Sequence, residues 1–139
     1  MNYWVIVLPR EDMEHCIKIQ VFGKNSSRYI KNIKRGDKIV CYASKEQKII
    51  AVGAATSDYY IDNEKVFKAD GDYPNRFNLR AVLLGQNEIG VKEIIDDLDY
   101  IRKKEYWHAY FRVSPKKITE KDWNTILETA RLREPSLTL

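Results

Sequence analysis

The sequence is poor in cysteine and histidine, and it contains no long hydrophobic run. Its 139 residues include two cysteines, Cys16 and Cys41, and two histidines, His15 and His108. They lack the spacing of a zinc site or a disulfide framework, so we expect no metal and interpret both cysteines as core thiols. The longest apolar run, Tyr3–Leu8, is far too short to span a membrane. No basic segment precedes it, so we expect no secretory signal and predict a cytoplasmic protein without a membrane segment.

The sequence also lacks the common signatures of enzymes. It contains no GxxxxGK phosphate loop, no GxSxG elbow and no HExxH motif. His15 and Cys16 are neighbours on a predicted helix, where adjacent side chains do not face each other, so a Cys–His nucleophile pair is not expected. His108 lies in an aromatic segment typical of a packed histidine. We therefore predict no catalytic residue and no cofactor.

Positive charge is present but unevenly distributed. The chain has 24 Lys+Arg and 20 Asp+Glu, a net charge of +4. Residues 18–48 contain nine basic and two acidic side chains, whereas residues 61–139 contain fourteen of each. A local basic segment attracts the phosphates of nucleic acids, although it is also compatible with an ordinary solvated surface. The candidates for phosphate binding are Arg28, Lys31, Lys34 and Arg35, with Lys24 next to them.

Length and hydrophobic patterning indicate a single folded domain over residues 1–139, with a frayed tail from about residue 131. We expect strands at residues 3–8, 38–44, 48–60, 77–83 and 106–113, helices at 10–20, 91–101 and from 119, and irregular loops at 22–27 and 62–75. Gly53 and its small neighbours predict a bend or a close backbone approach. The sequence therefore predicts an α+β fold, a small mixed β-barrel with peripheral helices.

Aromatic residues in loops are candidates for stacking on a base. The chain has nine tyrosines and three tryptophans, and most are expected in the core. Phe22 lies beside Gly23, and Tyr73 precedes Pro74, so both are predicted in loops near basic residues. Such side chains suit base stacking, or alternatively act as hydrophobic lids on the barrel.

Four segments, in this order, resemble the EVE domain. They are Tyr3-Trp4-Val5-Ile6, Val21-Phe22-Gly23, Lys34-Arg35-Gly36-Asp37-Lys38-Ile39-Val40, and the group formed by Tyr59-Tyr60-Ile61-Asp62, Val66-Phe67 and Tyr73-Pro74-Asn75-Arg76. The similarity covers roughly residues 3–127. It implies membership of the PUA-like superfamily of small mixed barrels, alongside the YTH readers of N6-methyladenosine.

What the resemblance implies is a non-catalytic pocket for a modified base that is turned out of a nucleic acid. Phe22 is the expected first aromatic wall, Tyr73 the second and Phe67 the next match, while Arg10 or Asp12 would contact the base edge. EVE domains also use the loop after the first helix and the end of the second strand. The residues that the resemblance assigns to the pocket are Arg10, Asp12, Phe22, Gly23, Lys24, Asn25, Tyr42, Phe67 and Tyr73.

Two other functions remain open at this point. In an ASCH-like RNA-directed hydrolase or coactivator, Arg10, Glu11, Lys24 and Tyr42 would form a hydrolytic site. In a protein-interaction module, the basic face would bind an acidic partner without any base pocket. The expected partner is nucleic acid, either RNA or DNA, and the sequence does not predict an oligomeric state.

Overall fold

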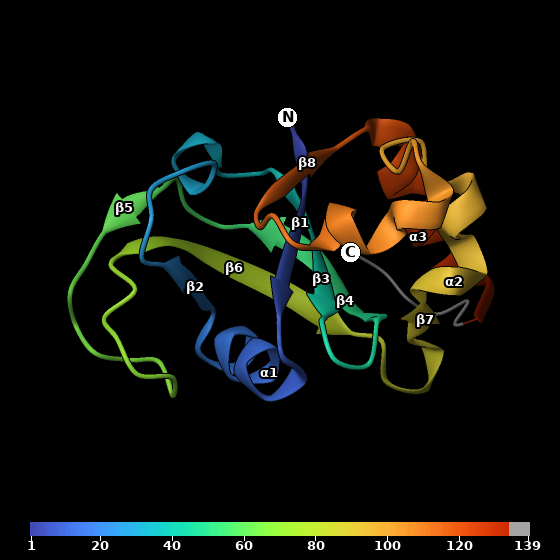
Figure 1. Ribbon diagram of the computed structural model, residues 1–139. Helices are drawn as coiled ribbons and strands as arrows, with labels where there is room; N and C mark the ends of the chain where they lie inside the picture. Colours follow the sequence, from blue (N-terminus) through green and yellow to red (C-terminus); the bar gives the residue numbers. More distant parts are fainter. Residues whose placement is uncertain (134–139) are drawn as a thin grey trace.

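The structure is a computed structural model that describes residues 1–133 (Figure 1). Its elements in chain order are β1 (Tyr3–Leu8), α1 (Arg10–Ile19), β2 (Val21–Lys24), the 3-10 helix η1 (Ile30–Asn32), β3 (Lys38–Ala43), β4 (Lys48–Ala55), β5 (Tyr60–Ile61), β6 (Asn75–Leu83), η2 (Gly85–Asn87), β7 (Ile89–Gly90), α2 (Val91–Ile94), η3 (Ile95–Asp97), η4 (Lys104–Phe111), β8 (Lys116–Ile118) and α3 (Glu120–Arg133). The strands form one curled sheet in the order β2-β6-β4-β3-β1-β8, with β5 on β6 and β7 on β4.

The centre of the sheet is buried on both faces, which is why its strands are nearly continuous apolar runs. β1 and β3 are parallel, so the chain must cross over between them, and α1 lies on that crossover. One face of the sheet forms a core with Ile6, Phe77 and Met13 of α1, and the other forms a core with Val5 and Trp123 of α3. Alternation along β1 thus sends neighbouring side chains into two different cores.

The sheet curls where β4 and β6 approach closely. A Cβ atom at Gly53 would lie 2.0 Å from the carbonyl oxygen of Arg80, so only glycine fits this position, as the small-residue pattern predicts. The curl confirms the predicted α+β fold, with the sheet forming a half-barrel. Within residues 1–133, no strand pairing joins β2 to β8. Instead, the Lys24 ammonium donates to the carbonyl of Ser114 across this open side, at 2.5 Å.

Some predicted elements differ from those observed. Residues 22–24 belong to β2, not to a loop, because they pair with β6. Residues 106–113 are not a strand: most of them lie in η4, and its buried residues Trp107 and Phe111 have the i, i+4 spacing of a helix. α3 continues through Arg133, and the rest of the tail predicted to fray from about residue 131 lies outside the described residues.

The helix predicted at residues 91–101 is also shorter than expected. α2 ends at Ile94 and is followed by the single turn of η3. Leu98 is extended, and the next two backbone N–H groups donate to the buried carboxylate of Asp122. A tertiary contact therefore replaces the helical hydrogen bonds. No helix in the described part of the chain is long and apolar enough to cross a membrane.

Candidate functional site

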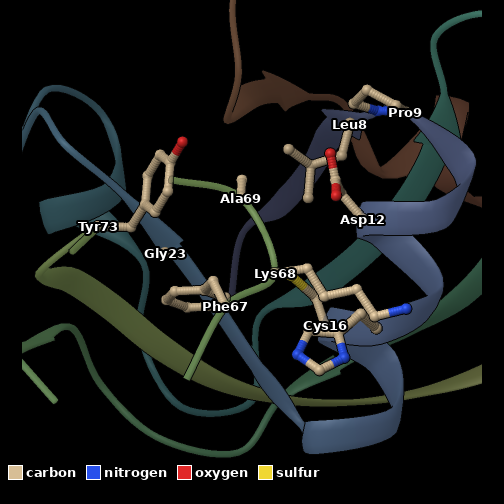
Figure 2. A pocket seen from close by; sticks show the side chains of 10 residues that line it. Leu8, Pro9, Asp12, Cys16, Gly23, Phe67, Lys68, Ala69 and Tyr73 are labelled. Atoms are coloured by element: carbon tan, nitrogen blue, oxygen red, sulfur yellow. The ribbon is translucent and has the colours of Figure 1, made fainter. Parts of the chain in front are cut away.

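A pocket of about 260 Å³ opens between α1, β2 and the loop of residues 62–74, hereafter the 62–74 loop (Figure 2). This volume is slightly below the range of roughly 300–1,000 Å³ typical of small-molecule sites, so it suits a small group. The residues that line it are Leu8, Pro9, Asp12, His15, Cys16, Gly23, Phe67, Lys68, Ala69 and Tyr73.

The walls of the pocket are mainly apolar. Phe67 and Tyr73 stand on one side, and Leu8 and Pro9 stand on the other (Figure 2). The two rings meet edge to face, with centroids 5.8 Å apart and an interplanar angle of 88°, which is a favourable geometry for an aromatic pair. The guanidinium of Arg76 lies over the Phe67 ring, 5.0 Å from its centroid.

Three polar side chains of α1 project from one face of the helix into the pocket. Asp12, His15 and Cys16 are separated by three and four residues, the spacing that places side chains on the same side. His15 Nε2 donates to the Val66 carbonyl at 2.9 Å and so joins α1 to the 62–74 loop. Burial raises the pKa of the Cys16 thiol to about 12, so it stays protonated near neutral pH and is a poor nucleophile. The carboxylate of Asp12 is the strongest hydrogen-bond acceptor in the pocket.

Arg76 holds the 62–74 loop in place. Its side chain is 2% exposed, and its guanidinium donates to the carbonyl oxygens of Tyr73 at 3.0 Å, Asp72 at 2.9 Å and Glu64. Asp62 lies 3.8 Å away as its ionic partner. These contacts join both ends of a loop that has no regular secondary structure. The aromatic wall therefore depends on a fork of N–H donors that lies beneath it.

Gly23 sets the depth of the pocket floor. A Cβ atom at this position would lie 2.7 Å from the Tyr73 carbonyl oxygen and 2.8 Å from the Phe67 ring. Since real Cβ atoms do not approach so closely, any side chain here would push the 62–74 loop away from β2. The backbone of β2 and the aromatic wall are thus in direct contact because residue 23 is glycine.

Sequence comparison identifies the family. A sequence model of the EVE domain matches residues 2–129. The chain belongs to the EVE domain family. The UPF0310 protein PH1033 of Pyrococcus horikoshii is 29% identical over 142 residues, which cover 91% of this chain and 97% of that protein.

Solved structures share the fold of this EVE domain at low identity. The NMR structure of Rpa0253 from Rhodopseudomonas palustris has a TM-score of 0.65 at 14% identity and covers 96% of each chain. The Pho92 YTH domain, crystallised in complex with m6A, has a TM-score of 0.72 at 11% identity and covers 97% of this chain and 86% of its own. At this identity the similarity establishes the fold alone, and it agrees with the PUA-like architecture expected from the sequence.

The structure brings four of the predicted pocket residues of the EVE domain together. Asp12, Gly23, Phe67 and Tyr73 all line the cavity. The sequence reasoning did not select the other lining residues, which are Leu8, Pro9, His15, Cys16, Lys68 and Ala69. His15 and Cys16 of α1 could have been predicted from helical periodicity, because they lie on the same helix face as Asp12. Arg76 belongs to one of the segments that resemble the EVE domain, but its role depends on burial, which the sequence does not reveal.

Phe22 and Tyr42 do not reach this pocket. Phe22 is 1% exposed and packs on Phe77, with ring centroids 5.6 Å apart, because its side chain points from β2 into the core. Tyr42 is 2% exposed and stacks on Phe111 at 4.1 Å on the opposite face of the sheet. Burial raises the pKa of Tyr42 to about 12. Phe22 and Tyr42 are therefore core residues of the EVE domain.

Arg10, Lys24 and Asn25 also lie outside the cavity. Arg10 makes a bidentate pair with Glu88, with both N···O distances 2.7 Å, and these hydrogen bonds raise its pKa. Lys24 extends toward Ser114, and burial lowers its pKa. Asn25 is exposed and offers its backbone carbonyl to Asn75. The carboxylate of Glu11 lies 3.7 Å from Lys68. The four residues of the alternative hydrolytic site, Arg10, Glu11, Lys24 and Tyr42, are therefore engaged in different contacts.

The four predicted phosphate-binding residues are all exposed, and none forms an ion pair within residues 1–133. Lys34 and Arg35 lie in the turn that also contains the buried Asp37, whose carboxylate accepts hydrogen bonds from the Asn2 and Lys34 backbones and from Trp4 Nε1. Asp37 thereby fixes the turn that presents Lys34 and Arg35. In the described part of the EVE domain, no three His, Cys, Asp or Glu side chains are arranged to hold a metal ion.

Proposed function

We propose that this EVE domain binds a nucleic-acid strand and takes one modified base into the pocket between α1 and the 62–74 loop. The observation that carries this proposal is the composition of the pocket, in which two aromatic rings face an aliphatic wall and one carboxylate supplies the only anionic acceptor. A base has two apolar faces and a polar edge, so such a pocket matches its chemistry.

The polar edge of the base would meet Asp12. A carboxylate accepts hydrogen bonds and cannot donate them while ionised, so it favours a base edge that carries an N–H group. An amino group bearing one methyl keeps such a hydrogen, and its methyl group would rest against Leu8 or Phe67. The m6A-bound Pho92 YTH domain, which shares this fold, binds a base of that kind. We therefore infer a preference for bases with a methylated amino group.

The energy balance is consistent with a binding protein. Turning a base out of a duplex requires a few kcal/mol, and less in a single strand. Stacking on aromatic walls returns roughly 1–3 kcal/mol per base, and contacts between exposed cations and phosphates supply the remainder. Arg28, Lys31, Lys34 and Arg35 are exposed candidates for these contacts. The protonated Cys16 supports binding without catalysis, because it leaves the pocket without a ready nucleophile.

The test is a binding titration against short RNA and DNA strands that are identical except for one base. The panel contains adenine, N6-methyladenine, cytosine, 5-methylcytosine and 5-hydroxymethylcytosine. Wild type is compared with Phe67→Ala, Tyr73→Ala and Asp12→Asn. Loss of one ring should weaken binding of the preferred strand by roughly five- to a hundredfold, the equivalent of one lost stacking contact. Asp12→Asn should reduce the discrimination between modified and unmodified strands.

The controls are residues of the same type outside the pocket. Tyr106→Ala removes an aromatic ring that is 63% exposed, and Asp97→Asn neutralises an exposed carboxylate. Neither should change the ratio of affinities. Equal affinity of wild type for every strand in the panel would exclude base readout, and cleavage of a strand would favour the hydrolase. Absence of nucleic-acid binding at low salt would favour a protein-interaction module.

A further inference from the structure

A second basic segment lies late in the chain. Residues 102–117 contain six basic side chains and one acid. Acidic residues elsewhere in residues 61–139 balance this positive charge, so the net charge of that region is zero and does not reveal the basic segment. Within the segment, residues 112–117 contain Arg112, Lys116 and Lys117 and no acid. Arg112 and Lys117 are exposed.

Ser114 contacts two residues that adjoin the pocket lining in the sequence, Val7 on β1 and Lys24 on β2. The Ser114 hydroxyl accepts a hydrogen bond from the Val7 backbone at 2.9 Å, next to Leu8 of the aliphatic wall. The Ser114 carbonyl accepts from the Lys24 ammonium, next to Gly23 of the floor. Ser114 therefore bridges β1 and β2 at the open side of the half-barrel. The orange segment that precedes β8 crosses beside β1 at this point (Figure 1).

The other end of residues 112–117 reaches the first basic region. β8 pairs antiparallel with β1, and Lys117 lies opposite Trp4. The Trp4 indole donates to Asp37 Oδ2 at 3.0 Å, and the same oxygen accepts from the Lys34 backbone at 3.0 Å. Residues 112–117 thus run from the edge of the pocket to the turn of Lys34 and Arg35. Trp4 and Asp37 thus connect β8 to the turn that carries Lys34 and Arg35.

The cations of this segment are available for a partner. Among residues 1–133, neither Arg112 nor Lys116 nor Lys117 forms an ion pair. β8 pairs only with β1 in the described sheet, so no strand of residues 1–133 pairs with its other edge. Lysines on an edge strand also prevent sheet-to-sheet association. That role does not explain Arg112, which precedes the strand, or the hydrogen bonds of Ser114 with Val7 and Lys24 beside the pocket lining.

We propose that residues 112–117 form a second phosphate-binding surface, which holds the nucleic-acid backbone between the pocket and the Lys34–Arg35 turn. This inference rests on the proposed function, since it places the strand whose base enters the pocket. Free cations along a chain segment match the regular negative charge of a nucleic-acid backbone. The surface carries no base-specific group, so it contributes affinity equally for modified and unmodified strands.

The test compares wild type with the double variant Arg112→Ala/Lys117→Ala on single strands with and without the modified base, over a series of KCl concentrations. Each lost phosphate contact on a single strand lowers the slope of log K against log salt by about 0.7, so the expected decrease is about 1.4. The ratio of affinities for the two strands should not change. Circular dichroism and a second double variant, Arg112→Gln/Lys117→Gln, guard against a folding defect.

The matched control is Lys92→Ala/Arg131→Ala, which also removes one lysine and one arginine, both exposed, from α2 and α3. Its slope should equal that of wild type. If both double variants at residues 112 and 117 keep the wild-type slope, or if the control loses as much, the second phosphate surface is wrong while the proposed function stands. If wild type binds strands without base preference, the proposed function is wrong. The salt slopes would still show whether residues 112–117 contact phosphates. If wild type binds no nucleic acid, both are wrong.

Discussion

At the scale of single residues, the aromatic side of the pocket depends on Arg76. A guanidinium that is 2% exposed is far from its usual place at the surface. Its burial is tolerated because its N–H groups reach three carbonyls of the 62–74 loop, because Asp62 supplies a counter-charge, and because the Phe67 ring covers it. A lysine has a single donor centre and cannot reproduce this fork.

We predict that Arg76→Lys destabilises the protein and disorganises the 62–74 loop. Two of the carbonyls would lose their donor, and a compact ammonium would remain buried, so we expect a loss of about 2–4 kcal/mol. Urea unfolding measures this change, and the NMR signals of Phe67 and Tyr73 report on the loop. Arg80→Lys is the control, because Arg80 lies on the same strand but is exposed. Equal unfolding midpoints for wild type and Arg76→Lys would show that the fork does not hold the loop.

Residues of the site differ in how far the sequence could predict them. Phe67, Tyr73 and Asp12 were predictable because their order matches a known family, and the structure brings them together. Phe22 matches the same order, yet it is buried against Phe77, because the strand that carries it turns its side chain inward. In a strand of four residues that contains a glycine, alternation is too short to indicate the direction of a side chain.

At the scale of elements, the strands of the sheet centre were predictable and the C-terminal helices were not. β1, β3 and β4 are continuous apolar runs, and hydrophobic pattern alone places them. The helix expected at residues 91–101 has an equally clear pattern, but Asp122 accepts the N–H groups of Asp99 and Tyr100 and ends it early. Asp122 is 0% exposed and lies more than twenty residues away. These two hydrogen bonds are tertiary interactions, which the local hydrophobic pattern does not predict.

α1 is joined to the turn between η2 and β7 by the pair of Arg10 and Glu88, and we predict that this link depends on pH. Hydrogen bonds from Arg10 lower the pKa of Glu88 below its usual value of 4.5. A carboxylate with a lowered pKa in the folded state stabilises the protein above the pKa of the unfolded chain. That contribution disappears as the pH falls through the lower, folded-state value. Glu88→Gln should therefore cost about 1 kcal/mol at pH 7 and nothing measurable once wild-type Glu88 is protonated.

Urea unfolding of wild type and Glu88→Gln at a series of pH values from 7 downward measures this difference. Glu11→Gln is the matched control, because Glu11 is mostly exposed and lies 3.7 Å from an exposed lysine. It should leave the unfolding midpoint unchanged over the same range. A difference between wild type and Glu88→Gln that persists undiminished in acid would contradict the assignment of the effect to this ion pair.

At the scale of the whole molecule, the open side of the half-barrel carries a positively charged side chain, that of Lys24. The α+β class was predictable from the alternation of elements, but the position of the opening was not, because it depends on which strands remain unpaired. The overall net charge of +4 likewise does not reveal that basic residues are concentrated in two segments, residues 18–48 and 102–117. Lys24 bridges the opening from β2 to Ser114, and it is half-buried next to the floor of the pocket. A cation in this position is expected to serve binding more than folding.

We therefore predict that Lys24→Met weakens nucleic-acid binding without destabilising the fold. Burial lowers the pKa of Lys24, so folding disfavours its charged form. At neutral pH the lysine is charged in the unfolded chain and partly desolvated in the folded one. As the pH rises through the lowered value toward 10.5, the unfolded state binds more protons than the folded state, and the stability of wild type increases relative to the variant.

Methionine keeps the apolar stem and removes the charge, so the Lys24→Met variant should stay within about 1 kcal/mol of wild type at pH 7. Urea unfolding at pH 7 and 10 measures the stability, and titration with a single strand should show a salt slope lower by about 0.7. Lys31→Met is the control for binding, because loss of this exposed cation should lower the salt slope by the same amount. A Lys24→Met protein that binds as wild type does, or that unfolds several kcal/mol more easily, would show that Lys24 serves the fold instead.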